Sequence, residues 1–491
     1  MGWSALLQDE YIKAVNDIAA GASIRIFLVG GHLRDQILKK RDTTFGSGSS
    51  SNSHYLDYDF AVISETEKGA IEFARLVSEK LNGVFVLLDE KNDTARVVLN
   101  SETQNQVNLD FAACVGGGIE SDVMRRDFSV NALAWDPLDP ENLIDKVQAL
   151  RDIENGMIRA LSQANLIDDP LRILRAYRFS AALSFSIDNT TQDWLAHNAH
   201  LLTGVAGERI SAELFALFSQ SNTFLHLQAM ANNKVLDAVF PELAATRVVT
   251  ANAYHHLGLM DHSLEAVRQM EIFYERASLQ LKESCNQIIG HKLNRLAVTK
   301  LATLLHDIGK PATWEITSEG RHTFYAHDSL GAKMSDDTAA RLKWSKSVSR
   351  FINRLIKWHL RPGALFHTGE PTQKAVHRFY RQVGTDVPEL ILLAYGDLGA
   401  TRGQGLVDEA RARLETRFDD LLNGYFVYIE EQARTPRFLT GADVMELLQI
   451  APGPMVGELL EALDEAQTLK IVNSRKEAER FAKDHFLKQS Q

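Results

Sequence analysis

The stretch that decides the fold is IRIFLVGGHLRD, which runs from Ile24 to Asp35. Its apolar, β-branched first half is typical of a strand, and residues 32–40 have the pattern of a helix. Gly30-Gly31 is then the turn between the two. Because backbone N–H groups at the start of a helix attract anions, this turn and Arg34 predict a site for a triphosphate.

A second polar sequence, Asp57-Tyr58-Asp59, lies at the start of another predicted strand. Side chains alternate between the faces of a strand, so Asp57 and Asp59 are expected to point the same way. Two such carboxylates repel unless a divalent cation lies between them, and magnesium prefers these oxygen ligands. Asp110, on a later strand, is a candidate third ligand, and the three aspartates form the predicted catalytic set. A solvated strand edge is the structural alternative.

The first third of the chain mixes strands with helices, and the apolar spacing from Ile158 onward is mostly helical. Composition predicts a flexible loop at residues 46–53. Further strands are predicted at residues 58–63, 84–88, 95–99 and 107–112. The expected fold class is α+β, with a mixed-sheet head followed by an all-α neck, body and tail. The predicted domains are residues 1–155, 156–235, 236–410 and 411–491.

Bulk composition restricts the class of protein. The 491 residues carry a formal net charge of -11, so any contact with nucleic acid must come from a local basic face. The two cysteines lack CxxC spacing, which argues against a disulfide framework or a thiolate zinc site. We expect a cytoplasmic protein, because the N-terminus lacks a signal pattern and no apolar run is long enough to cross a membrane.

Four ordered motifs resemble the class II nucleotidyltransferase family of CCA-adding enzymes and bacterial poly(A) polymerases. The family pattern GGxVRD followed by DxD corresponds to residues 30–35 and 57–59, with Leu33 in place of valine. RRDFTxNAL corresponds to residues 125–133, and GERIxxEL to residues 207–214. EDPLRxLRxxRF corresponds to residues 168–179, with an aspartate where the family has its first glutamate.

The resemblance implies that Asp169 and Arg172 select the incoming base in place of a nucleic-acid template. A carboxylate accepts from the exocyclic amine that ATP and CTP possess and UTP lacks. Asp169 is also expected to cap a helix, with Pro170 in its first turn. The predicted nucleotide-binding residues are Gly30, Gly31, Arg34, Arg126, Asp127, Asn131, Asp169, Arg172, Arg175 and Arg178.

A second constellation, in the helical body, includes the sequence HDIGK at residues 306–310. Its order of histidines and aspartates resembles the HD phosphohydrolase superfamily, and these side chains suit a divalent metal whose identity the sequence does not give. The predicted ligands are His262, His306, Asp307, His327, His359 and Asp397. His255-His256 is interpreted as structural or substrate-side.

The resemblance implies an enzyme that adds CMP and AMP to tRNA 3′ ends by two-metal phosphoryl transfer, with magnesium in the head and ATP and CTP as substrates. No protein partner is evident, and the tail is a predicted tRNA-contacting region. The alternatives are a poly(A) polymerase and an RNA-binding HD phosphohydrolase with a sensor head. The interval from Asp110 to Arg125 is shorter than the loop of full CCA enzymes, so complete CCA, CC-only and A-only addition all stay open.

Overall fold

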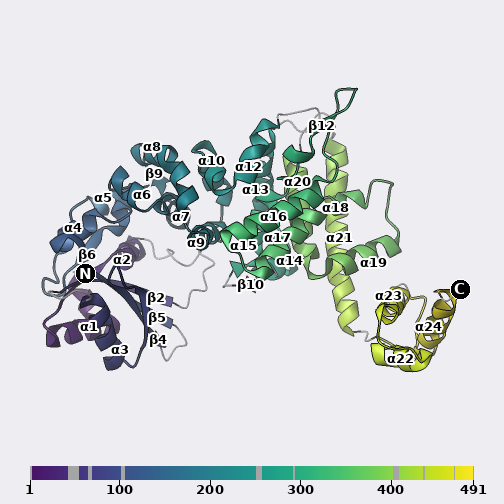
Figure 1. The fold of residues 1–491 in the computed structure, drawn as a ribbon, viewed down its shortest axis with the longest axis horizontal. Helices are drawn as coiled ribbons and strands as arrows, with labels where there is room; N and C mark the ends of the chain where they lie inside the picture. Colours follow the sequence, from purple (N-terminus) through teal and green to yellow (C-terminus); the bar gives the residue numbers. More distant parts are fainter. Residues whose placement is uncertain are drawn as a thin grey trace. The chain divides into compact units, whose positions relative to one another are not determined.

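The computed structural model describes residues 3–41, 55–64, 69–100, 106–249, 257–290, 293–401, 408–434, 437–468 and 470–489. The chain divides into two compact units, Met1–Pro241 and Glu242–Gln491, which Figure 1 shows in purple to teal and in teal to yellow. No described helix combines the length and the apolar character that crossing a membrane requires. The predicted loop at residues 46–53 and His255-His256 lie outside the described residues.

The first unit contains a seven-stranded mixed sheet in the order β3-β4-β5-β2-β1-β6-β7. Only β2 and β5 are parallel neighbours, and the other adjacent pairs are antiparallel. The predicted strands and the mixed sheet are confirmed, whereas the three-residue strands β6 and β7 were not predicted. The bounds are β1 Arg25–Val29, β2 Tyr55–Ile63, β3 Val84–Asp89, β4 Thr94–Asn100, β5 Gln106–Ala113, β6 Leu133–Trp135 and β7 Leu143–Asp145.

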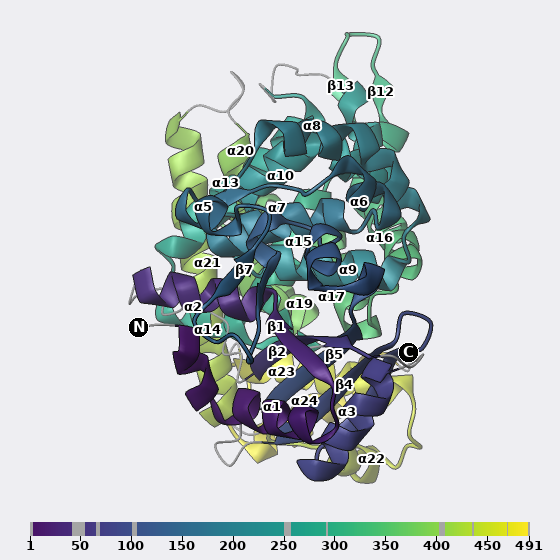
Figure 2. The ribbon, with the colours of Figure 1, turned by 90° about the vertical axis from the view of Figure 1, so that its left-hand side faces the viewer.

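One face of this sheet is apolar, and helices α1 (Glu10–Gly21) and α3 (Gly69–Lys80) pack beside its strands; Figure 2 shows both next to β1, β2 and β4. Phe60 of β2 stacks on Phe111 of β5, and Phe73 of α3 meets Phe111 edge to face. Since side chains alternate along a strand, burying Phe60 and Phe111 turns the neighbouring residues 59 and 110 to the opposite face.

The rest of the first unit is helical, and α7 packs mainly against α9. Its remaining helices are α2 Gly31–Arg41, α4 Ile119–Met124, α5 Ala149–Glu154, α6 Gln163–Asp168, α7 Arg172–Leu183, α8 Asn189–Asn198, α9 Gly207–Phe218, α10 Thr223–Asn232 and α11 Val235–Val239, and α12 Pro241–Ala244 crosses into the second unit. The short strands β8 Met157–Ile158 and β9 Ser186–Ile187 pair in parallel.

The second unit is helical apart from short hairpins formed by β10 Ile288–Gly290 with β11 Leu293–Asn294 and by β12 Glu315–Ile316 with β13 His322–Thr323. The helical pattern predicted beyond Ile158 is thus confirmed. Its helices are α13 Leu259–Glu275, α14 Leu279–Asn286, α15 Arg295–Leu305, α16 His327–Leu342, α17 Lys346–Trp358, α18 Arg361–Ala364, α19 Gln373–Val383, α20 Val387–Ala400, α21 Asp408–Arg434, α22 Gly441–Leu448, α23 Pro454–Thr468 and α24 Arg475–Gln489.

Helices α13 and α20 approach each other closely at Gly396. A Cβ atom at this position would lie 2.5 Å from the carbonyl oxygen of Ala266, so only glycine permits the contact. The close approach brings His262, one turn before Ala266, next to Asp397.

Candidate active site and metal centre

The predicted catalytic aspartates lie on the face of the sheet opposite the phenylalanine cluster. In the parallel pairing of β2 with β5, Asp59 is opposite Asp110 and Asp57 is opposite Asn108. Asn108 Nδ2 donates to Asp57 Oδ1 at 2.7 Å. Arg96 of β4 donates to both oxygens of Asp110, with distances of 2.6 and 2.7 Å. Neither Arg96 nor Asn108 was predicted from the sequence. Arg96 forms an ion pair with Asp110, the candidate third ligand.

Asp59 is partly buried and lies close to Asp57, Asp110 and Arg126. Burial, together with the nearby Asp110 and Asp57, raises the pKa of Asp59 to about 6, although Arg126 acts to lower it. A partly buried carboxylate with this excess of negative charge fits a divalent cation. In the part of the chain that the structure describes, the three aspartates do not form a compact donor group of the kind found in the second unit. Because Arg96 neutralises Asp110, Asp57 and Asp59 are better candidates for metal ligands than Asp110 is.

The glycine turn lies against this site. Gly30 has a φ of 79°, and a Cβ atom there would lie 3.2 Å from Arg126 Nη1 and 3.3 Å from Asp59 Oδ2. The N–H of Gly30 donates to the carbonyl of Leu133 at 3.1 Å. The N–H group of Gly30 is therefore used within the protein, and the binding of a triphosphate by Gly30 and Gly31 stays a prediction.

Arg34 is buried, with 8% of its surface exposed. Its Nη1 donates to Asn131 Oδ1 at 2.5 Å and its Nε donates to Asp35 Oδ1 at 2.8 Å. The guanidinium is thus held in a fixed orientation at the base of the turn.

Asp127 joins the 125–133 segment to helix α7. It accepts from Arg175 Nε and Nη2 at 2.9 and 2.7 Å, from Asn131 Nδ2 at 3.1 Å and from the backbone N–H of Phe128 at 2.8 Å. Burial alone would raise the pKa of Asp127, but Arg175 and these hydrogen bonds lower it. The structure therefore brings these three predicted residues together as an internal network.

The two residues predicted to select the base lie at the start of α7. Asp169 does not occupy the N-cap position, which is Leu171, because the chain makes one further turn after Pro170. Asp169 Oδ1 accepts from the N–H of Leu171 at 3.3 Å, and its Oδ2 accepts from Arg209 Nη2 at 3.0 Å. Arg172 Nη1 donates to the carbonyl of Asn165 at 3.0 Å.

Helix α9 supplies partners to α7 through the GERI motif. Besides the contact from Arg209, Glu213 accepts from Arg178 Nε at 2.5 Å and from Arg175 Nη1 at 3.4 Å. The sequence identified this motif but did not indicate what its charged residues contact. The observed ion pairs give Arg209 and Glu213 the role of holding the charged face of α7.

The interval between Asp110 and Arg125 is folded. After β5 it forms a 3-10 turn at Val115–Gly117 and the short helix α4. Asp122 of α4 accepts from Arg126 Nη2 at 3.1 Å. The interval therefore contains a 3-10 turn and a helix, and it contacts Arg126 of the site through Asp122.

In the second unit the structure brings the six predicted HD residues together. Histidine nitrogens and carboxylate oxygens from these residues form three overlapping groups, each with ligand atoms within 4.8 Å of one another. His306, His327 and His359 each direct Nδ1 to a backbone carbonyl three residues earlier, at 2.7 Å in every case. This contact leaves Nε2 facing the centre, which is the orientation that metal-binding histidines require.

Asp307 lies between two pairs of histidines. Its Oδ2 is 3.2 Å from His306 Nε2 and 3.6 Å from His262 Nε2, and its Oδ1 is 3.3 Å from His327 Nε2 and 3.7 Å from His359 Nε2. Burial alone would lower the pKa of His306, but Asp307 and Asp397 raise it to about 10. Buried carboxylates that hold a proton on a histidine are also suited to a cation, so this donor set fits a divalent metal.

Three family models match consecutive parts of the chain. The poly A polymerase head domain matches residues 26–159, the probable RNA and SrmB-binding site of polymerase A matches residues 184–246, and the HD domain matches residues 249–394. These models join a nucleotidyltransferase head to an HD domain, and the chain is thus an enzyme of the nucleotidyltransferase class.

Relatives that match over nearly their full length show which family of nucleotidyltransferases the chain belongs to. The chain is 31% identical to the A-adding tRNA nucleotidyltransferase of Deinococcus radiodurans over 92% of its own length and 94% of the relative. It is 29% identical to the CC-adding tRNA nucleotidyltransferase of Thermus thermophilus over 93% and 92%. The chain therefore belongs to the class II tRNA nucleotidyltransferase family.

The fold agrees with this assignment. The Thermotoga maritima CCA-adding enzyme complexed with tRNA superposes with a TM-score of 0.63 at 21% identity, over 99% of both chains. An apo form of a CCA-adding enzyme gives a TM-score of 0.65 at 21% identity, over 97% of this chain and 96% of the other.

Proposed function

We propose that this protein adds CMP or AMP to the 3′ end of tRNA, with ATP and CTP as substrates. The observation that carries the proposal is the pair Asp57 and Asp59 on the open face of the sheet, in a chain related over its full length to tRNA nucleotidyltransferases. Asp57 and Asp59 would hold Mg²⁺, which lowers the pKa of the RNA 3′-hydroxyl and neutralises the leaving pyrophosphate.

The chain's own residues position the reactants. Gly30 keeps the space beside Asp59 free of a side chain, and the start of α2 presents N–H groups to the triphosphate. Asp169 and Arg172 would contact the edge of the incoming base. Arg209 holds the Asp169 carboxylate in a defined orientation for this contact. Asp127, Asn131 and Arg175 would act by positioning α7 against the head.

Base selection gives a direct prediction. Asp169→Ala or Arg172→Ala is expected to lower the preference for CTP over UTP about 10- to 100-fold. A hydrogen bond between a charged side chain and the matching base contributes about this much to discrimination, and the variant loses it. The measurement is kcat/KM for each nucleotide on one tRNA. Asp168→Ala, at the exposed neighbouring position, is the control and should keep the preference. Equal slowing of all four nucleotides would show that the two residues do not read the base.

The relatives leave the extent of addition open, because some add A and others add CC. We propose that cytidine addition is faster than adenosine addition. A change from cytidine to adenosine requires Asp169 and Arg172 to change orientation, and the folded interval between β5 and Arg126 offers few side chains that could contact and move them. The experiment compares single-turnover incorporation of CTP on tRNA ending at the discriminator base with that of ATP on tRNA ending in CC. Equal or faster ATP incorporation would refute the proposal and indicate an A-adding or complete CCA-adding enzyme.

The HD centre supports a second proposal, metal-dependent phosphoester hydrolysis. His262, His306, Asp307, His327, His359 and Asp397 would hold a divalent metal, which supplies a hydroxide nucleophile when bound. The three histidines fixed through Nδ1 and the central Asp307 favour this proposal. Since both proposed activities act on nucleotides or RNA, we also propose that the protein works in the cytoplasm.

A further inference from the structure

The second unit contains a strongly basic segment in an acidic protein. Residues 343–361 include six lysines and arginines and no aspartate or glutamate, whereas the whole chain has a formal net charge of -11. The six residues are Lys343, Lys346, Arg350, Arg354, Lys357 and Arg361, and all six are exposed.

Helix α17 gathers four of these charges on one side. Lys346, Arg350, Arg354 and Lys357 follow one another at intervals of four, four and three residues, so they share one face of the helix. The opposite side of α17 is apolar and buried, through Val348, Phe351, Ile352, Leu355 and Ile356. We call the four exposed cations the α17 basic face.

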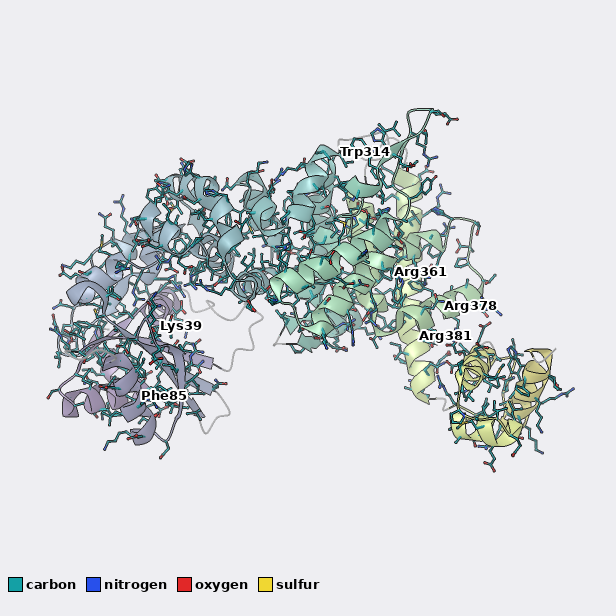
Figure 3. The ribbon with its side chains drawn as sticks, in the orientation of Figure 1. Lys39, Phe85, Trp314, Arg361, Arg378 and Arg381 are labelled. Carbon is teal, nitrogen blue, oxygen red and sulfur yellow. The ribbon has the colours of Figure 1, made fainter. Side chains whose placement is uncertain are left out.

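A neighbouring helix shows that such charges can be neutralised within the protein. On α19, Lys374 and Arg378 pair with Glu465 of α23, and Arg381 pairs with Glu461. Figure 3 labels Arg378 and Arg381 there, with Arg361 nearby on α18. The basic residues of α19 are therefore used to attach the C-terminal helices.

Three of the four cations of the α17 basic face have no comparable ion-pair partner among the described residues. Arg354 pairs with Asp386, but among the described residues no carboxylate oxygen lies within 4.0 Å of the Lys346, Arg350 or Lys357 side-chain nitrogens. Asp336, on the adjacent helix α16, instead accepts from the neutral side chains of Ser349 and Asn353. Lys346, Arg350 and Lys357 are left facing solvent.

This arrangement opposes helix formation. Like charges four residues apart repel, and Lys346 lies in the first turn, where the helix dipole disfavours a cation. A polyanion bound along the face would remove both effects. A membrane surface fits less well, because the apolar side of α17 is already buried and no apolar side chains of the face remain for insertion.

We propose that the α17 basic face binds the sugar-phosphate backbone of the tRNA substrate, at nucleotides other than those of its 3′ end. The identity of the RNA rests on the proposed function. From Lys346 to Lys357 the helix extends about 16 Å, and at about 3.4 Å per nucleotide along one strand it faces roughly five nucleotides. Contacts of this kind fix the position of the RNA without reading its sequence.

The test is a triple variant, Lys346→Glu/Arg350→Glu/Lys357→Glu, compared with a control of equal net charge, Lys80→Glu/Arg276→Glu/Lys333→Glu. All three control positions are exposed and lie outside the face. The affinity for labelled full-length tRNA is measured across salt concentrations. We expect the α17 variant to bind at least about 10-fold more weakly, with a salt dependence reduced by about two to three phosphate contacts. The control should stay within twofold of the unmodified protein.

Equal affinity of the α17 variant and the unmodified protein would overturn the proposal, as would an equal loss in the control, which would show an effect of net charge alone. A Lys346→Gln/Arg350→Gln/Lys357→Gln variant keeps the result interpretable if the glutamate variant fails to fold. Incorporation at saturating RNA should be unchanged. If the unmodified protein binds tRNA but adds no nucleotide, the proposed function fails while the binding surface is still tested.

Discussion

Asparagine in place of Asp59 is expected to lower nucleotide incorporation at least about 100-fold and, in the same protein, to raise the unfolding temperature at neutral pH. The first effect follows from the loss of a charged ligand at the proposed magnesium site. The second follows from the environment of Asp59, where burial and the neighbouring carboxylates raise its pKa to about 6. Without a bound cation, the negative charge of the partly buried Asp59 lowers the stability of the folded protein.

The sign of the stability effect follows from linkage. In the unfolded chain the pKa of an aspartate is about 3.9, so folding disfavours the ionised form of Asp59. Below about pH 4 Asp59 is protonated, and its burial does not lower the stability of the folded protein. As the pH rises from about 4 through about 6, ionisation of Asp59 lowers the free energy of unfolding. Because the pKa of Asp59 is raised by about two units on folding, its ionisation lowers the free energy of unfolding by at most about 3 kcal/mol. The asparagine variant does not ionise, so its advantage should be largest at pH 7.5 and should disappear near pH 4.

The measurements are single-turnover incorporation of CTP on tRNA ending at the discriminator base, and calorimetric unfolding of metal-free protein between pH 4 and 7.5. Asp57→Asn is the matched control, because Asp57 is exposed and already accepts from Asn108. It should lose incorporation without gaining stability. Incorporation by Asp59→Asn within threefold of the unmodified enzyme would contradict the metal assignment.

The sequence predicted what depends on local pattern. The pattern of residues 58–63 and 107–112 predicted the two strands, and alternation predicted a common face for Asp57 and Asp59. That Asp59 and Asp110 lie opposite the phenylalanine cluster is an observation of the structure. Strands β6 and β7 were not predicted because three residues are too few to show a period of two. The cap position of α7 differed by two residues because Pro170 and Leu171 form one more turn before the helix begins.

The partners of the predicted site residues could not be read from the sequence. Arg96 contacts Asp110 only because β4 and β5 pair in a particular register, and Arg209 reaches Asp169 only because α9 packs on α7. The charges of α17 are visible in the sequence. Those of α19 are neutralised because Glu461 and Glu465 lie beside them in the fold, whereas on α17 only Arg354 has such a partner among the described residues.

The HD centre gives the second large effect. His306→Ala/Asp307→Asn is expected to abolish binding of divalent metal in the second unit and any metal-dependent phosphodiesterase activity, while nucleotide addition stays within threefold. The proposed magnesium ligands and the HD residues belong to different compact units, and sites without shared partners respond to substitution independently. Asparagine at position 307 keeps the volume of a side chain that is fully buried.

Metal binding is measured by the rise in unfolding temperature on adding Mn²⁺, Co²⁺ or Ni²⁺, because a ligand at 100 times its Kd stabilises the folded protein by about 2.7 kcal/mol. Hydrolysis of bis-p-nitrophenyl phosphate is followed in the same samples. The control is His377→Ala, which removes another buried histidine of this unit, one that belongs to none of the HD donor groups. It should retain both the metal response and nucleotide addition. If the double variant stays folded but stops adding nucleotides, the two centres are coupled and the picture of independent sites is wrong; if it keeps the full metal response, the HD residues are not the ligands.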